Sequence, residues 1–158
     1  MGHDSELYAL AIDDELRGNV REFSHPEAKT GDITIFHFAL PSPMSAEFGA
    51  LRRGRVLQYH NVTPARFFAP YEPALYRLAS IAREELAGLA NVTDLALGDS
   101  EYNRQELEGL NFSKTGVMAS LALRNRFKNT CCSLCSTPWT RAGEGHSSRR
   151  SFTLLPAS

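Results

Sequence analysis

Residues 31–41 read Gly-Asp-Ile-Thr-Ile-Phe-His-Phe-Ala-Leu-Pro, and this stretch decides the fold class. From Ile33 to Leu40 it is an unbroken run of β-branched, aromatic and aliphatic residues, which Pro41 closes. Such a run is too short for most helices and is typical of a strand buried inside a parallel sheet. We therefore expect a strand at 33–40.

Further strands and helices alternate on either side of this run. Strands are expected at 5–12, 55–60, 94–98 and 115–123. A helix is expected from Pro73, which suits a first turn, and its apolar residues recur at helical spacing; they are Leu75, Leu78, Ala79, Ala82, Leu86 and Leu89. Shorter helices are expected near 45–51 and from Ser100 to about Gly109. This alternation predicts an α/β protein with a Rossmann-like parallel sheet.

The composition changes near residue 123. The whole chain of 158 residues has a net charge of −1, yet the residues after 123 hold six Arg or Lys and one Glu, together with all three cysteines. That part lacks strand or helix periodicity, and its Gly-, Ser- and Arg-rich section is typical of disorder. We expect one domain at 1–122, followed by a disordered tail at 123–158.

Several classes of protein are disfavoured by the sequence. A net charge of −1 gives no general attraction to nucleic acid. No apolar run reaches the roughly 18 residues of a membrane-spanning helix, and the first residues do not resemble a secretory signal. These features predict a cytoplasmic protein that binds no nucleic acid.

Polar side chains gather where the predicted strands end. His37 lies in the strand expected at 33–40, His60 and Asn61 lie where the strand at 55–60 ends, and Ser100 follows the strand at 94–98. Ligands of open parallel sheets bind beyond the carboxyl ends of the strands, so these four are the candidate substrate-binding residues. Each also has a structural interpretation: His37 as a core histidine, His60 and Asn61 as loop packing, and Ser100 as a helix cap.

No sequence motif identifies a reaction or a metal centre. The chain has no GxSxG, P-loop, HExxH or GxGxxG pattern. Cys132 and Cys135 have a CxxC spacing, to which Cys131 and His146 could add ligands. A zinc site usually needs a second well-spaced pair of ligands, so no metal is expected.

Four segments resemble one enzyme family, in register and in the expected order over residues 1–119. They are GHDSELY at 2–8, GDITIFH at 31–37, QYHNVTP at 58–64 and DLALGDSEYNRQEL at 94–107. Together they resemble the N-terminal domain of family 4 (group 1) glycosyltransferases of the GT-B fold. The resemblance implies a nucleotide-sugar donor, no other cofactor, and a sugar acceptor bound near His37, His60, Asn61 and Ser100. His60 is then the candidate catalytic residue.

The sequence departs from this family at both ends. The family's first strand, its Gly-rich loop and its C-terminal donor domain have no counterpart here, and the tail resembles nothing in the family. We therefore expect a truncated hexosyltransferase-like fragment that is inactive alone and for which a separately encoded donor domain is a candidate partner. The alternative is a non-catalytic α/β binding or interaction module. In either case the sheet should lack the strand between 5–12 and 33–40, leaving an altered order or an unpaired interior edge.

Overall fold

Strands and helices alternate along the chain in the computed structural model, which describes residues 4–118 and 150–155. The strands are β1 (Asp4–Ala9), β2 (Val20–Glu22), β3 (Ile33–Phe38), β4 (Gly54–Tyr59), β5 (Leu95–Gly98), β6 (Thr115–Val117) and β7 (Arg150–Leu155). The α-helices are α1 (Met44–Ala50), α2 (Pro73–Gly88) and α3 (Glu101–Gly109). Short 3₁₀ turns are η1 (Asp14–Leu16), η2 (Pro26–Lys29) and η3 (Ala65–Phe67).

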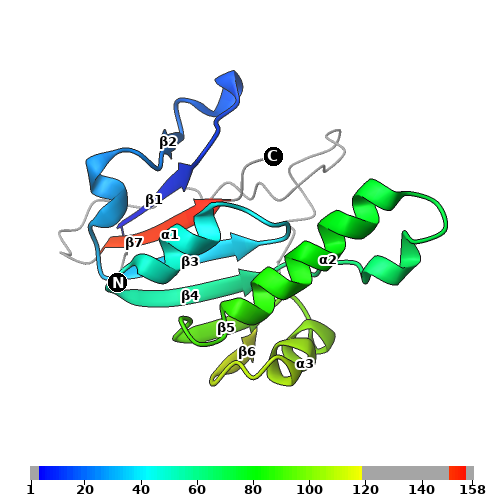
Figure 1. Cartoon of the computed structure of the whole chain (residues 1–158). Helices are drawn as coiled ribbons and strands as arrows, with labels where there is room; N and C mark the ends of the chain where they lie inside the picture. Colours follow the sequence, from blue (N-terminus) through cyan, green and yellow to red (C-terminus); the bar gives the residue numbers. More distant parts are fainter. Residues whose placement is uncertain (1–3, 119–149, 156–158) are drawn as a thin grey trace, which may run out of the picture.

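The described strands form a single parallel sheet in the order β2-β1-β7-β3-β4-β5-β6. This confirms the prediction of an α/β protein with a Rossmann-like parallel sheet. The chain moves from β3 to β6 one strand at a time, with α1, α2 and α3 in the connections (Figure 1). The ends of β3, β4 and β5 therefore lie next to one another at the carboxyl edge of the sheet.

The place between β1 and β3 is occupied, contrary to expectation. Strand β7 pairs in parallel with β1 on one side, where Leu7 is opposite Thr153, and with β3 on the other, where Ile35 is opposite the same residue. Figure 1 shows β7 between these two strands. The sheet therefore has no open interior edge, and residues 150–155 of the predicted disordered tail form a strand. The rest of that tail up to residue 149 lies outside the described residues.

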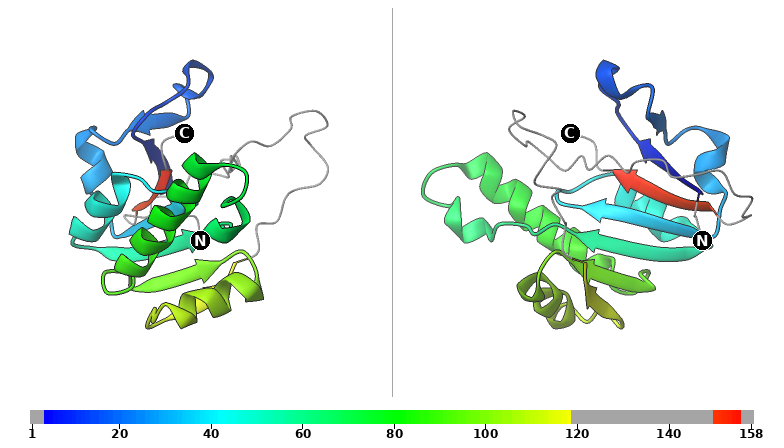
Figure 2. Two further views of the ribbon diagram at one scale, coloured as in Figure 1. Left: turned by 45° about the vertical axis from the view of Figure 1, so that its right-hand side comes forward. Right: turned by 180° about the vertical axis from the view of Figure 1, so that it is seen from behind.

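Alternation along the strands divides the side chains between the two faces of the sheet. Phe36, Phe38, Leu57 and Tyr59 are fully buried, and they share the core with residues of α1 and α2 such as Phe48. The two helices cover the same face, as the views in Figure 2 show. Because neighbouring residues in a strand point to opposite faces, His37 and Gln58 lie on the other face.

Helix α2 begins at Pro73 as predicted, but only part of its apolar side is buried. Ala79, Ala82 and Leu86 face the core, whereas Leu75 and Leu78 are exposed. The reason is visible in Figure 1, where η3 and the first half of α2 project beyond the carboxyl ends of β3 and β4. Among residues 4–118 and 150–155, no helix combines the length and the apolar character needed to cross a membrane.

Candidate functional site

Three adjacent strands bring polar side chains together at the carboxyl edge of the sheet. In the register of β3 and β4, His37 is opposite Gln58, and in that of β4 and β5, Gln58 is opposite Leu97. His60 follows β4 by one residue and Asp99 follows β5 by one residue. This alternation places the four polar residues on the same side of the sheet.

A chain of hydrogen bonds links two histidines to a carboxylate. His37 Nδ1 lies 2.7 Å from His60 Nε2, and His60 Nδ1 lies 2.8 Å from Asp99 Oδ2. The two imidazole rings are nearly parallel, at 11°, with centroids 5.0 Å apart. We call this arrangement of His37, His60 and Asp99 the His–His–Asp chain.

The carboxylate fixes which nitrogens carry protons. An ionised carboxylate only accepts, so His60 donates from Nδ1 to Asp99. With both rings neutral, His60 Nε2 then accepts from His37 Nδ1, and His37 Nε2 keeps a lone pair. The His–His–Asp chain therefore presents His37, at its end, as a hydrogen-bond acceptor, while both ring nitrogens of His60 are used inside the chain.

Gln58 holds Asp99 in place from within the sheet. Its amide Nε2 donates a hydrogen bond to Asp99 Oδ1 and a longer one, of 3.4 Å, to the carbonyl of Met118. The Gln58 side chain is only 2% exposed, and its carbonyl oxygen has no hydrogen-bond partner among the described residues. Both oxygens of Asp99 thus accept hydrogen bonds, one from Gln58 and one from His60.

The electrostatics keep His37 neutral near pH 7. Burial, with a smaller electrostatic contribution from His60, lowers the pKa of His37 to about 4, although Asp99 acts in the opposite direction. A neutral imidazole can accept a proton or a hydrogen bond, whereas an imidazolium cannot. The arrangement is therefore suited to accepting hydrogen bonds at neutral pH.

A second polar network fixes the chain where it leaves β4. The hydroxyl of the buried Tyr59 donates to Glu106 Oε2 at 2.6 Å and accepts from the backbone N–H of Val62. Arg83 pairs with the other oxygen of Glu106 at 2.6 Å and donates to the carbonyl of Val62. Burial, together with the hydrogen bond to Glu106, raises the pKa of Tyr59. These contacts hold the segment after His60 against α2 and α3.

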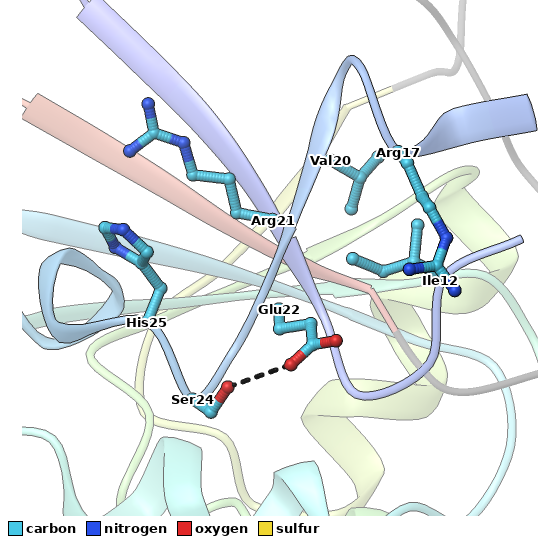
Figure 3. Close-up of a pocket in the computed structure, with 7 residues that line it drawn as sticks. All are labelled: Ile12, Arg17, Val20, Arg21, Glu22, Ser24 and His25. Atoms are coloured by element: carbon cyan, nitrogen blue, oxygen red, sulfur yellow. Dashed lines mark hydrogen bonds between the residues drawn. The ribbon is translucent and has the colours of Figure 1, made fainter. Parts of the chain in front are cut away.

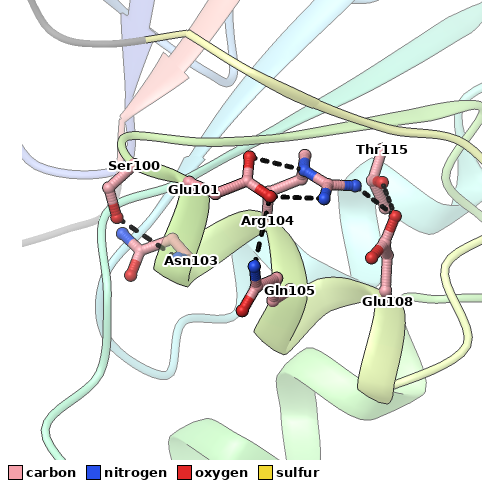
Figure 4. A network of polar contacts seen from close by, with 7 residues as sticks. All are labelled: Ser100, Glu101, Asn103, Arg104, Gln105, Glu108 and Thr115. Carbon is pink, nitrogen blue, oxygen red and sulfur yellow. Dashed lines mark hydrogen bonds and ion pairs between the residues drawn. The ribbon is translucent and has the colours of Figure 1, made fainter.

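The two other candidates lie outside the His–His–Asp chain. Asn61 is exposed and has a φ of 75°, a left-handed conformation that Asn tolerates better than most residues, so it turns the chain after β4. Ser100 caps α3: its Oγ accepts from the backbone N–H of Asn103 at 3.2 Å (Figure 4). The structure thus brings His37 and His60 together, and it gives Asn61 and Ser100 local backbone roles.

Figure 4 also shows how the surface of α3 is organised. Arg104 pairs with Glu101 and Glu108 on its own helix, and Glu108 in turn accepts from Thr115 of β6 at 3.1 Å. Because Arg104 already has two carboxylate partners, this side of α3 is poorly suited to an anionic ligand.

Sequence reasoning left Gln58 and Asp99 out of the candidate site. Asp99 stands in the polar run after β5, but its link to His60 depends on the order of the strands. Gln58 lies inside a strand, where only its register with His37 shows which face it occupies. The alternation of side chains along β4 was the signal that could have found it.

A shallow hollow beside the edge strand β2 is a weaker candidate. It measures about 350 Å³ and is lined by Ile12, Arg17, Val20, Arg21, Glu22, Ser24 and His25 (Figure 3). Arg17 is paired with Asp14, and Arg21 is paired with Glu27. With these charges already balanced, the hollow has little attraction for an anion.

The described residues contain no group of three or more His, Cys, Asp or Glu side chains arranged to hold a metal ion. The possible zinc ligands Cys131, Cys132, Cys135 and His146 lie outside the described residues. The sequence-based view that the chain binds no metal therefore stays a prediction.

Comparison with known proteins gives one informative similarity. The chain is 33% identical, over 98 residues, to the potassium-binding subunit of a potassium-transporting ATPase from Chromobacterium violaceum. The match covers 56% of this chain but only 16% of that relative. No family model matches the chain, and no solved structure matches it.

This similarity overturns the expected function. The sequence predicted a fragment that transfers sugar from a nucleotide-sugar to an acceptor, whereas the similarity is to a transport protein. Glycosyl transfer is therefore the wrong function for this chain, and a sugar acceptor is not its indicated partner. The family resemblance of the four sequence segments is not tested by any of these comparisons.

Proposed function

We propose that this α/β domain is an accessory part of a potassium-transport system, on the cytoplasmic side of the membrane. The observation that carries the proposal is the 33% identity over 98 residues to the potassium-binding subunit of a potassium-transporting ATPase. Because the chain spans 16% of that subunit's length, the proposal concerns association with such a system and not transport by this chain alone.

The geometry of the site favours association over ion binding. Potassium is held by rings of oxygen atoms, as in the carbonyl cages of selectivity filters. At the carboxyl edge of the sheet, both oxygens of Asp99 already accept hydrogen bonds. Of the other groups, the carbonyl oxygen of Gln58 is a single oxygen ligand and not a ring, and the rest are imidazoles. Imidazole nitrogen suits transition metals better than hard cations. We therefore assign the domain a role in assembly or regulation.

The test is co-purification with a potassium-transporting ATPase. The tagged full chain is mixed with the detergent-solubilised Chromobacterium violaceum complex, and recovery and potassium-stimulated ATP hydrolysis are measured. We expect the two to elute together and the potassium concentration for half-maximal hydrolysis to shift. Independent elution at micromolar concentrations, with unchanged hydrolysis, would refute the proposal.

Two glycine variants provide a matched control. A Cβ at Gly98 would lie 2.7 Å from the backbone nitrogen of Arg104, so Gly98→Ala should disrupt the packing of β5 on α3. A Cβ at Gly88, at the end of α2, meets nothing within 4 Å. Association that depends on the folded domain should be lost in Gly98→Ala and kept in Gly88→Ala.

A further inference from the structure

The position between β1 and β3, which we call the β1–β3 slot, is filled by a strand that is distant from both in the sequence. Strand β7 pairs in parallel with all six residues of β1 and with four residues of β3, and Figure 1 shows it between them. Pairing of this kind is made by backbone hydrogen bonds, which do not depend on the molecule that supplies the strand. The slot is therefore an acceptor for an extended parallel segment.

Contacts outside β7 hold the two sides of the β1–β3 slot together. Strand β1 pairs with β2, and β3 pairs with β4, without any part played by β7. Tyr8 of β1 and Phe23, which follows β2, belong to the same buried cluster as Phe36 of β3. Arg53, directly before β4, donates a hydrogen bond of 3.0 Å to the carbonyl of Ala28 in η2. The slot can therefore keep its shape while one β7 leaves and another enters.

The connection that leads to β7 is long enough to reach a second molecule. Residues 118–149 join the end of β6 to the start of β7, and about 32 residues span up to roughly 110 Å when fully extended. Strands β6 and β7 are four positions apart in the sheet, or about 20 Å. The length of the chain therefore allows β7 to occupy its own slot or that of a second copy.

We propose that β7 is exchanged between two copies of this chain, so that the β1–β3 slot of each copy holds β7 of the other. The exchange keeps the pairs of β7 with β1 and β3, and it leaves no open strand edge at the slot. Because the exchange is reciprocal, it closes as a dimer with two-fold symmetry. This inference stands on the sheet topology and does not depend on a role in potassium transport.

Protein concentration sets the balance between the monomer and the exchanged dimer. A strand tethered to its own slot competes at an effective concentration of the order of 1 mM or lower, because this value falls as the connection lengthens. Both forms make the same strand pairs, so the dimer is a small fraction at about 10 µM and a major one at about 1 mM. The fraction of chains in the dimer should therefore rise about tenfold or more over this range.

Cysteines placed on separate copies test the exchange without any transport protein. Ser5 of β1 is paired with Ser151 of β7, and adjacent strands lie about 4.8 Å apart, within the roughly 4.4–6.8 Å between Cα atoms that a disulfide bridges. Full-length chains with Ser5→Cys or Ser151→Cys are mixed, unfolded in urea and refolded together at about 10 µM and about 1 mM. In all of them the native Cys131, Cys132 and Cys135 are changed to serine. We expect oxidation to give a covalent dimer whose yield rises about tenfold or more with concentration.

Two matched chains serve as controls for this experiment. Ser24→Cys, at an exposed position after β2, replaces Ser5→Cys in the mixture and measures random cross-linking. A single chain with both Ser5→Cys and Ser151→Cys should form the disulfide within itself at about 10 µM, which verifies that β7 enters the slot.

The comparison of these chains decides the matter. The proposal is wrong if, at about 1 mM, the separate Ser5→Cys and Ser151→Cys chains cross-link no more than the Ser24→Cys control, while the doubly substituted chain closes within itself. It is also wrong if the doubly substituted chain forms no disulfide, because β7 would then not lie in the slot. Covalent products that consist only of species larger than a dimer would overturn the reciprocal exchange.

Discussion

Acidification should destabilise this domain through His37. Burial and the neighbouring His60 hold the pKa of His37 at about 4, below the ordinary value of 6.5. As the pH falls through 6.5, the unfolded chain takes up a proton at this position, but the native chain does not. Stability from the neutral imidazole is therefore complete above pH 6.5 and is lost as the pH falls towards 4.

The size of this loss follows from the two pKa values. At about 1.4 kcal/mol for each pH unit, the interval between 6.5 and about 4 corresponds to roughly 3–4 kcal/mol of unfolding free energy. Because His37 is partly accessible to water, screening reduces this to about 2–3 kcal/mol. That is a substantial part of the total stability of a small domain, which is typically about 5–15 kcal/mol.

The variant His37→Gln isolates the effect. Glutamine can still donate a hydrogen bond to His60 Nε2, but it does not titrate, so the variant should lose about 2–3 kcal/mol less stability than the wild type on acidification. Urea unfolding followed by far-ultraviolet circular dichroism, near neutral pH and at about pH 4.5, measures both losses. His25→Gln, at an exposed position in the turn before η2, should behave as the wild type does. Equal losses in the wild type and His37→Gln would refute the reasoning.

Five further substitutions, at four positions, test the framework around the site. Gly98→Ala should lower the unfolding free energy by about 3 kcal/mol or more, because its Cβ would lie within 2.9 Å of α3 backbone atoms. Gly88→Ala should raise the unfolding free energy by about 0.5–1 kcal/mol. Urea titration measures both changes. Asn61→Val should lower the melting temperature and cost about 1–2 kcal/mol, since a β-branched residue is strained at a φ of 75°, and Asn61→Gly should cost much less. Glu106→Ala should cost about 2–3 kcal/mol in chemical denaturation because it leaves the buried Tyr59 hydroxyl without its acceptor; a loss below 0.5 kcal/mol would show that water replaces that contact.

The local pattern of the sequence was sufficient to predict most of the strands and helices. The apolar runs at 33–40, 55–60 and 94–98 became β3, β4 and β5, and Pro73 and Ser100 marked the starts of α2 and α3. Strand β7 was not predicted, because its place depends on partners more than 110 residues away in the sequence, and no local pattern encodes such a pairing. Strand β2 has only three residues, too few to show a period.

From the sequence alone, residues of the site could be predicted only where they lie in or at the end of a predicted strand. The rule that ligands bind beyond the carboxyl ends of strands selected His37 and His60, which the structure places 2.7 Å apart. Gln58 and Asp99 required the register of three neighbouring strands. The exposure of Leu75 and Leu78 required knowing where the sheet ends beneath α2, which helical periodicity does not reveal.

The position of β7 has a consequence for the order in which the chain can fold. Strands β1 and β2 pair with each other, and β3 to β6 form a second group, but the backbone ladder between the groups passes through β7. A ribosome completes β7 after all the other described strands. The hydrogen bonds of β7 with β1 and β3, which join the two groups, therefore cannot form while residues 4–118 are emerging. During that interval β1 and β3 each expose an unpaired edge, which chaperones or neighbouring nascent chains can bind. Folding of this domain is therefore expected to be slow, with its closing step made by its most sequence-distant strand.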